Sequence, residues 1–272
     1  MIKIGIGIPT SFVPSSVSYD TNASAYFSAA GITNTSVKTA INNFVVSLKA
    51  QGLWTKLYAF YPIVGNLTQS SYNLVTPGSY QVTWADTPTI TSNSIAFNGT
   101  TQYGNTNFSP IAVAGFSMND VSFGCWDATG FNSRTEIPMG TTQDSGFQRI
   151  RAVWFNTNSN ILDIMSNNDT TSRVVFLSQA VGHWHFQRLS NVTSVYFNGA
   201  SYGTNSSAGD ISIIPTNKIF IGATSDGVAG ANTPALYSQK TYKFFYIAKG
   251  LTGPQITTFN TLLTTLNTAL GR

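Results

Sequence analysis

The residue types that carry out acid–base chemistry are scarce in this chain. Among its 272 residues there is one glutamate, Glu136. A retaining glycosidase needs two carboxylates about 5 Å apart, one as nucleophile and one as acid/base. Aspartates can in principle substitute, but five of them form no Asp-x-Asp or Glu-x-Asp strand motif that would put both carboxylates on one face: Asp120, Asp127, Asp144, Asp163 and Asp169. The pattern disfavours a hydrolase and assigns no catalytic residue.

The only two histidines are His183 and His185. They are two residues apart in an alternating strand pattern, so both side chains point to the same face. Such a pair is half of a zinc site, yet a stable site needs three or four ligands. The one cysteine and the few acids supply no visible third ligand. We expect a solvent-facing or hydrogen-bonded histidine pair, with no metal and no cofactor.

Other chemistries have weaker signals. Asp226 in TSDGVAG and Asp169 in NNDTT are acids in loops, but neither loop has the dense Asp/Asn spacing of a dedicated calcium site, so calcium is a disfavoured alternative. No GxSxG elbow occurs. The start GIGIP lacks the lysine–serine pair of a phosphate-binding loop and is typical of an extended strand.

Sugar binding requires exposed aromatic rings flanked by amide and hydroxyl groups, and the chain is rich in all three. Four tryptophans lie in strand patterns and are expected in the core: Trp84, Trp126, Trp154 and Trp184. Three tyrosines in loops are better candidates for exposure: Tyr103, Tyr202 and Tyr237. The sequence does not indicate which of them line one site, so the ligand-binding residues stay unassigned.

The composition indicates a folded protein with a large core. Charged residues make up 9% of the chain, hydrophobic residues 42% and aromatic residues 13%. Lys and Arg outnumber Asp and Glu by 14 to 10, but they are scattered, whereas phosphate-tracking proteins cluster them. Nucleic acid is therefore not an expected partner. Cys125 is the single cysteine, which excludes an intrachain disulfide and indicates a buried, inert thiol.

The sequence contains no run of about 18 apolar residues that could span a membrane. The apolar run within MIKIGIGIPTSF is too short for a secretory signal. We expect a soluble chain. Export by a classical signal is not indicated, and release within a virus particle by lysis is one other route out of a cell.

The last third of the chain predicts a series of strands. Residues 183–189 alternate, with Trp184 and Phe186 on one face. Residues 193–204 repeat the alternation and contain Asn-Gly, the pair favoured in tight hairpins. Residues 243–247 are apolar without alternation, which predicts a strand covered on both faces.

Two regions instead show helical spacing. Apolar residues at 37, 40, 41, 44, 45 and 48 predict an amphipathic helix, with caps at residues 34–36 and a stop at Gly52. A second short helix is predicted over residues 53–60, ended by Pro62. At the end of the chain, Thr252 and Gln255 form a capping box before a stripe of apolar residues, which predicts a docked helix over 253–270.

The order of these strands carries a resemblance. The chain resembles the concanavalin A-like (laminin G-like) jelly roll in the order of four strands. These are a tryptophan strand, a strand ending in aromatic-Asn-Gly, an Ile-Gly strand (217–223) and an aromatic strand ending in Gly-Leu-Thr before a helix. SIAFNGTTQYGNTNF and DVSFGCWDATG resemble its opening strand and next core strand. The resemblance implies a mainly β fold: a jelly-roll sandwich over residues 66–272, including the C-terminal helix.

The first quarter carries a second resemblance. Residues 29–66 are similar to the helical stretch before lectin-like domains in bacteriophage and prophage structural proteins. The shared pattern is Lys-x-x-Gly-Leu-Trp-x-Lys followed by Ala-aromatic-Tyr-Pro, which is KAQGLWTK and AFYP in this chain. An SPGSY-like segment follows in such proteins, and TPGSYQVTW occupies that place here. The resemblance implies a small N-terminal helical module over residues 21–65 and an N-terminal arm over residues 1–20.

Together the resemblances imply a non-enzymatic structural protein of the bacteriophage virion, such as a spike, fibre, tail or capsid-associated protein. Its partners would be other virion proteins in an oligomeric assembly, with a host-surface glycan as a candidate ligand. Two alternatives stay open: a carbohydrate-binding module of a bacterial cell-surface system and, more remotely, a glycoside hydrolase.

Overall fold

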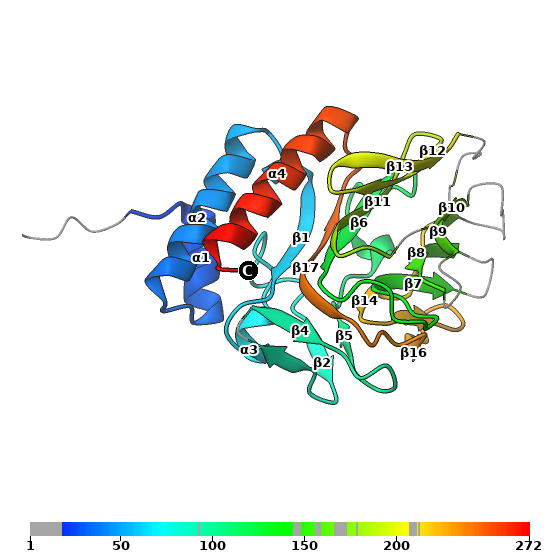
Figure 1. Cartoon of the computed structure of the whole chain (residues 1–272), viewed down its shortest axis with the longest axis horizontal. Coiled ribbons are helices and arrows are strands. Elements are labelled where there is room, and N and C mark those ends of the chain that lie inside the picture. The colour runs from blue at the N-terminus through cyan, green and yellow to red at the C-terminus, as the bar shows by residue number, and fades with distance from the viewer. Residues whose placement is uncertain are drawn as a thin grey trace, which may run out of the picture.

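Two β-sheets packed face to face, with a layer of helices on one side, make up the structure (Figure 1). The computed structural model describes residues 18–91, 93–143, 148–155, 159–165, 173–177, 179–206, 211 and 213–272. The mainly β sandwich with helices near both ends of the chain confirms the predicted fold class. Most of the predicted N-terminal arm, including the extended strand expected at GIGIP, lies outside the described residues.

Sheet A is the sheet that faces the helices. Its strands are antiparallel, and β1 pairs with β17 beside the main path. In spatial order they are β13 (Ala200–Asn205), β12 (Val192–Phe197), β11 (Gly182–Leu189), β6 (Asp120–Asp127), β17 (Thr241–Ala248), β4 (Ser94–Ala96) and β3 (Thr89–Thr91), with β1 (Leu57–Pro62).

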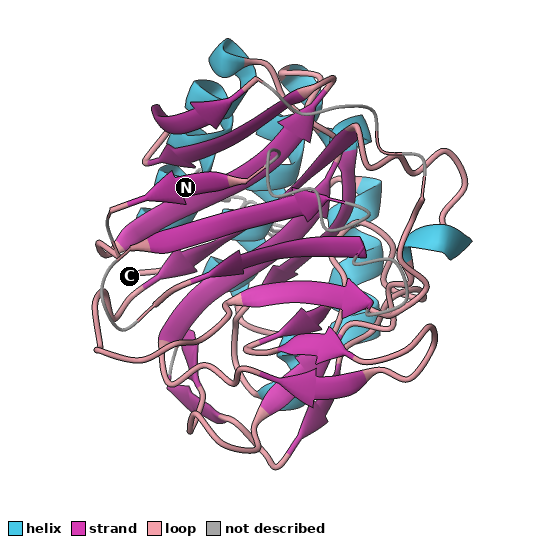
Figure 2. Ribbon diagram, turned by 90° about the vertical axis from the view of Figure 1, so that its right-hand side faces the viewer, coloured by secondary structure: helices cyan, strands magenta, loops and turns pink. Residues whose placement is uncertain are grey.

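Sheet B lies on the far side of the sandwich. Figure 2 shows strands in front and the large helices behind them. In spatial order sheet B comprises β10 (Val174–Phe176), β9 (Asn160–Met165), β8 (Gln148–Val153), β7 (Met139–Gln143), β14 (Phe220–Ile221), β5 (Tyr103–Asn105) and β2 (Thr83–Ala85). β15 (Thr224–Asp226) pairs with β7, and β16 (Thr233–Ala235) pairs with β15.

The predicted alternation in β11 is confirmed. Trp184 and Phe186 belong to the sandwich core and are completely buried. His183 and His185 point to the opposite face, but this face is buried too, because α4 (Gly253–Ala269) packs on that side of sheet A. The β12–β13 hairpin turns through Asn198 and Gly199, whose φ angles of 49° and 82° explain the Asn-Gly pair.

β17 is buried on both faces, as its uninterrupted apolar sequence predicts. Tyr242, Phe245 and Ile247 contribute to the sandwich core. Phe244 and Tyr246 contribute instead to a second core between sheet A and the helices. This strand therefore joins two hydrophobic cores and contains several of the largest buried side chains of the chain.

The helical layer is formed by α1 (Thr21–Ala30), α2 (Thr35–Ala50) and α4. α2 begins as predicted, with the Asn34 side chain accepting a hydrogen bond from Val37 N at 3.1 Å. In α4, Gln255 Oε1 accepts from Thr252 N at 2.9 Å, the reciprocal bond of a capping box. Among the described residues, no helix is both long and apolar enough to cross a lipid bilayer.

The short helix predicted over residues 53–60 is wrong. The structure has a single 3-10 turn, η1 (Trp54–Lys56), followed by β1. β1 pairs with β17, with Ala59 opposite Ile247 and Tyr61 opposite Phe245. A segment this short has little helical stability of its own. Sheet pairing buries its aromatic side chains on both faces, which the 3-and-4 spacing of the apolar residues did not reveal.

Substitutions in β17 and at the start of α4 are expected to lower the free energy of unfolding by different amounts. Replacing Phe245 by Ala is expected to lower the free energy of unfolding by about 3–5 kcal/mol, because a fully buried ring is lost. Replacing Thr252 by Ala should cost about 0.5–2 kcal/mol through the loss of a cap. Urea titration followed by circular dichroism measures both values, and a milder effect for the Phe245 variant would contradict the assignment of β17 to the core.

Candidate functional site

An open groove runs beside α3 (Leu67–Ser70), and we call it the α3 groove. One part has a volume of about 360 Å³ and adjoins a second of about 510 Å³. The two share Leu67, Thr68 and Thr87 as lining residues. The remaining lining residues are Gly65, Asn66, Ser71, Gln81, Val82, Trp84, Asp86, Pro88, Thr89 and Ile90. The groove thus lies at one edge of the sandwich, where β2 of sheet B leads into β3 of sheet A.

Trp84 forms one wall of the α3 groove. Its Nε1 donates to Leu67 O at 3.0 Å, which connects β2 to α3. The ring lies against Gly104 of β5, where a Cβ atom would come within 2.5 Å of it. Glycine at position 104 therefore leaves space for the indole. Trp84 is only partly buried, and its ring lines a surface that a ligand can reach.

The turn that follows β2 holds Asp86 at the groove in an unusual conformation. Asp86 and Thr87 have φ angles of 50° and 49°, in the left-handed region that β-branched residues rarely occupy. Gln102 Nε2 donates to the carbonyl oxygens of both residues, at 2.9 and 3.1 Å. Backbone strain of this kind concentrates at ligand-binding sites. The clamped turn leaves both side chains exposed at the groove.

Two of the three tyrosines expected to be exposed lie next to this turn. Tyr103 and Tyr237 make an edge-to-face contact at 6.1 Å between ring centroids, and both are half-buried. Burial raises the pKa of Tyr237, and Tyr103 and the Asp86 carboxylate add to the shift. Tyr202 is exposed but belongs to β13 and packs near Trp184, in another part of the sandwich.

The prediction that all four tryptophans are core residues holds for two of them. Trp154 and Trp184 are completely buried. Trp84 and Trp126 each pack against the margin of a core but are only partly buried. Trp84 is at the edge of the sandwich, and Trp126 points away from the sandwich core, where Lys243 Nζ lies 5.4 Å from its ring centroid.

A second polar cluster is completely buried, and we call it the buried triad: Asp127, Glu136 and Lys240. Lys240 Nζ lies 2.9 Å from Asp127 Oδ2 and 3.9 Å from Glu136 Oε1. All three side chains are inaccessible to solvent. Burial raises the pKa of both carboxyl groups, and the Lys240 ammonium opposes that shift. Glu136, which is solitary in the sequence, therefore has a carboxylate neighbour on the other side of a lysine.

The two histidines form a buried hydrogen-bonded network with β17. Tyr246 Oη lies 2.9 Å from His183 Nε2 and 2.7 Å from His185 Nδ1. His185 Nε2 lies 3.1 Å from Gln187 Oε1, and His183 Nδ1 lies 3.0 Å from the Asn260 side-chain amide on α4. The network confirms the prediction of a hydrogen-bonded pair. Within the described part of the chain, no three His, Cys, Asp or Glu residues gather as a metal site would need.

The fixed acceptor at Gln187 Oε1 determines which atom donates in each hydrogen bond of this network. Gln187 Oε1 also accepts from Leu251 N, so His185 Nε2 must donate to it. His185 Nδ1 then accepts the Tyr246 hydroxyl proton, and the Tyr246 oxygen accepts from His183 Nε2. In neutral His183, Nδ1 is then an acceptor and needs a donor. The Asn260 side chain supplies that donor when its amide oxygen and nitrogen exchange places, so that Nδ2 faces His183 Nδ1. Burial keeps both rings neutral, lowering the pKa of His183 to about 3 and that of His185 to about 4.

A third cluster surrounds Asp163 on β9. Arg149, Arg151 and Arg173 lie within 3.8, 3.4 and 2.8 Å of its carboxylate oxygens. Asp163 is completely buried, and the three guanidinium groups are mostly buried. Gly140 of β7 leaves space for Arg151, because a Cβ atom at position 140 would come within 2.6 Å of Arg151 Cβ. The cluster joins three strands of sheet B through charge pairs.

The remaining candidate residues have structural contacts or lie outside the described residues. Asp120 accepts a hydrogen bond from Gly250 N at 2.8 Å. Asp226, the residue of the disfavoured calcium alternative, is half-buried at the end of β15, and among the described residues it belongs to no group of three possible metal ligands. Cys125 is buried as predicted, and burial raises its thiol pKa. Asp144 and Asp169 lie outside the described residues.

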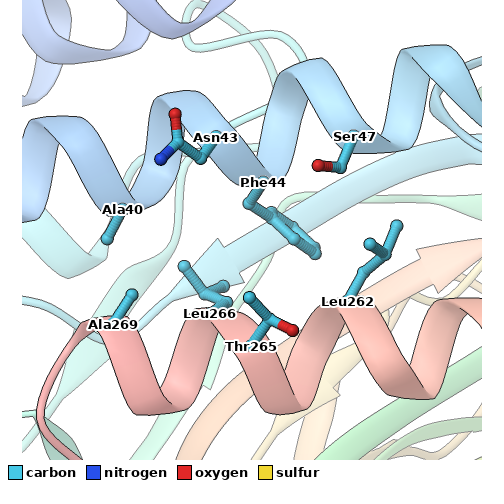
Figure 3. A pocket seen from close by; sticks show the side chains of 8 residues that line it. All are labelled: Ala40, Asn43, Phe44, Ser47, Leu262, Thr265, Leu266 and Ala269. Atoms are coloured by element: carbon cyan, nitrogen blue, oxygen red, sulfur yellow. The ribbon is translucent and has the colours of Figure 1, made fainter.

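A smaller cavity of about 80 Å³ lies between α2 and α4 (Figure 3). The figure shows Phe44 and Leu266 pointing into the space between the helices. No titratable side chain lines it; the lining residues are Ala40, Asn43, Phe44, Ser47, Leu262, Thr265, Leu266 and Ala269. The cavity is a packing defect between helices, and it offers a ligand no charged partner.

The fold is similar to that of Trypanosoma rangeli sialidase, with a TM-score of 0.53 and 11% identity over 84% of this chain and 39% of the sialidase chain. The same sialidase in complex with the inhibitor DANA gives 0.52 and 12%, over 81% and 38%. The binding domain of botulinum neurotoxin serotype D gives 0.52 and 11%, over 76% and 52%. The chain therefore spans less than half of the sialidase chains. No protein-family model and no curated protein matches the sequence.

These similarities correct one sequence-based prediction. The scarcity of paired acids led to the prediction of a protein that is not an enzyme, and the sialidase matches contradict it, because enzymes contain this fold. At 11–12% identity the likeness shows the fold alone. More than half of each sialidase chain is unmatched, so the comparison does not locate the sialidase activity in the shared part. The structures named here do not test the virion assignment, which stays a prediction.

The buried histidines give the stability a predictable pH dependence. Their pKa values of about 3 and about 4 are below the 6.5 of the free side chain, so the unfolded chain binds more protons as the pH falls below 6.5. The stability contribution is therefore complete above pH 6.5 and decreases toward pH 4. At pH 5 each histidine should lower the unfolding free energy by about 2 kcal/mol relative to pH 7.5.

Asp127 and Glu136 have raised pKa values and change the stability in the opposite direction, so a variant comparison isolates the histidines. His185→Gln should be less stable than the wild type at pH 7.5 but should lose about 2 kcal/mol less between pH 7.5 and pH 5. Urea midpoints at the two pH values measure the difference. Equal losses in the two proteins would show that His185 is not buried in its neutral form.

Proposed function

We propose that this chain is a carbohydrate-binding β-sandwich domain and that the α3 groove is its binding site. The observation that carries the proposal is the combination of an accessible indole, Trp84, with an exposed amide, Gln81, and an exposed carboxylate, Asp86, in one open groove. The shared fold of sialidases and a toxin binding domain supports a role in recognition without identifying the ligand.

The chemistry of the groove suits a sugar. A pyranose ring has an apolar face that packs on an indole and a rim of hydroxyl groups that need hydrogen-bond partners. Thr68, Gln81 and Asp86 offer donors and acceptors along the groove beside Trp84. The strained turn at Asp86 and Thr87 is held by Gln102, so these partners are in place before a ligand arrives.

Binding can be tested on an array of neutral and acidic oligosaccharides, followed by calorimetric titration of the glycans retained. Asp86→Asn removes the charge at constant shape and should weaken binding about tenfold, the effect of losing one charge-assisted hydrogen bond. Trp84→Ala should weaken it at least as much. Asp226→Asn changes a partly exposed carboxylate on β15, outside the groove lining, and should bind normally.

The proposal fails if no glycan is retained, or if the Asp86 and Asp226 variants bind equally well. Trp84 also packs against Gly104, so circular dichroism has to show that its variant is folded before the binding data are interpreted. Asp86 is exposed and its side chain makes no hydrogen bond that stabilises the fold among the described residues, which makes Asp86→Asn the decisive variant.

Glycoside hydrolysis is the second candidate function, and the observation that favours it is the fold shared with sialidases. Asp86 is the carboxylate of the α3 groove that a bound sugar can reach, and Tyr237 is the nearby phenol. Release of reducing sugar from any glycan retained on the array, measured for the wild type and for Asp86→Asn, tests this alternative. Turnover that is lost in the variant would place the chemistry in the groove.

The virion location and the virion partners expected from the sequence complete the proposal, with the α3 groove displayed toward a host-surface glycan. The support is the resemblance of residues 29–66 to bacteriophage structural proteins. Mass spectrometry of purified particles tests it, because a structural component is present in a constant copy number. Absence of the chain from particles would favour the bacterial cell-surface alternative.

A further inference from the structure

The buried triad has a geometry that a simple ion pair does not require. Asp127 Oδ1 accepts two backbone hydrogen bonds, from Thr129 N at 2.7 Å and Gly130 N at 3.0 Å. The other oxygen, Oδ2, lies 2.9 Å from Lys240 Nζ. Lys240 also donates to the carbonyl oxygen of Gly130. The amine is thus held in hydrogen-bond contact with one oxygen of a carboxyl group whose other oxygen already accepts from two N–H donors.

Glu136 completes the arrangement. Its Oε2 accepts from Ser238 Oγ at 3.1 Å and from Gln239 N at 2.6 Å, which fixes the carboxylate in place. Its Oε1 lies 3.9 Å from Lys240 Nζ and makes no close hydrogen bond among the described residues, although the Asn132 side chain is near enough to oppose the rise that burial causes in the pKa of Glu136. A buried carboxylate oxygen without a close hydrogen bond is costly, so its position beside the amine calls for an explanation. Trp154 closes one side, with its ring centroid 4.3 Å from Nζ.

We propose that Lys240 and Asp127 condense to an isopeptide bond inside the folded protein, with Glu136 transferring the protons. Proton transfer from the ammonium to the carboxylate first gives a neutral amine and a neutral acid. The Nζ lone pair attacks Asp127 Cγ, and the N–C bond forms while negative charge develops on Oδ1. Glu136 Oε1 takes a proton from Nζ and delivers it to the Oδ2 hydroxyl, which leaves as water when the C–O bond breaks.

The step balances without any further reactant: an ammonium and a carboxylate become one amide and one water, and Glu136 returns to its starting state. The surrounding groups contribute to this reaction in two ways. The Thr129 and Gly130 amides stabilise the developing charge on Oδ1, as in an oxyanion hole. The fold holds amine and acid in contact, which replaces a collision by a unimolecular step.

Burial provides the driving force for this condensation. Lys240 and Asp127 are charged groups with no solvent access, and a neutral amide removes both charges from the apolar interior. Burial also raises the pKa of Asp127 and of Glu136, which favours the proton positions that the reaction needs. The bond would link β6 to the residue that precedes β17, across 113 positions of the sequence.

The intact mass of the purified full-length chain under denaturing conditions tests the proposal. The wild type should be lighter than its sequence mass by one water, about 18 Da. Digestion should yield one branched peptide that contains both Lys240 and Asp127. Lys240→Arg and Glu136→Gln should have their full sequence masses. Lys243→Arg, which changes another lysine near the same strand, should retain the loss of one water.

A wild type at its full sequence mass after prolonged incubation in the folded state would overturn the proposal. A water loss that persists in Lys240→Arg would overturn it as well, because dehydration at another aspartate would then be the cause. If Glu136→Gln does not fold, the branched peptide of the wild type still decides the question, since it identifies the linked residues directly.

Discussion

β17 is the element on which the other parts of the structure depend. It lies between β6 and β1 and is buried on both faces, so its side chains have to satisfy two hydrophobic cores at once. Phe245 and Ile247 complete the sandwich, and Phe244 and Tyr246 anchor the helices. A sheet with one solvated face would leave these aromatic side chains in water. The helical layer of α2 and α4 is therefore a requirement of sheet A rather than an independent addition.

Covering sheet A has consequences for the polar groups on its outer face. His183 and His185 lie beneath α4, where water does not reach them, so each ring nitrogen must find a partner within the protein. Tyr246 provides one for both rings. The same covering buries this face around the two histidines, whereas the α3 groove lies at an edge of the sandwich and is open to solvent.

The sequence predicted those parts of the structure whose information is local. Alternation identified β11, the Asn-Gly pair identified the β12–β13 hairpin, and the capping box identified α4. β1 was missed because its pairing with β17 joins residues far apart in the chain, which no local spacing records. The buried triad was missed for the same reason: a search for two acids on one strand passes over Asp127 and Glu136, which only the fold brings to Lys240.

The accessibility of carboxylates decides where any carbohydrate chemistry of this chain can take place. Glu136 and Asp127 are the two acids that the fold brings together around Lys240, yet both are completely buried, and a sugar cannot reach them without unfolding the sandwich. Asp86 carries no motif and is exposed at an open groove beside an indole. The backbone strain at Asp86 and Thr87 also has no role in either core, and the two hydrogen bonds from Gln102 maintain it. A rigid, exposed and strained turn at a groove is better explained by recognition of a ligand than by the stability of the fold.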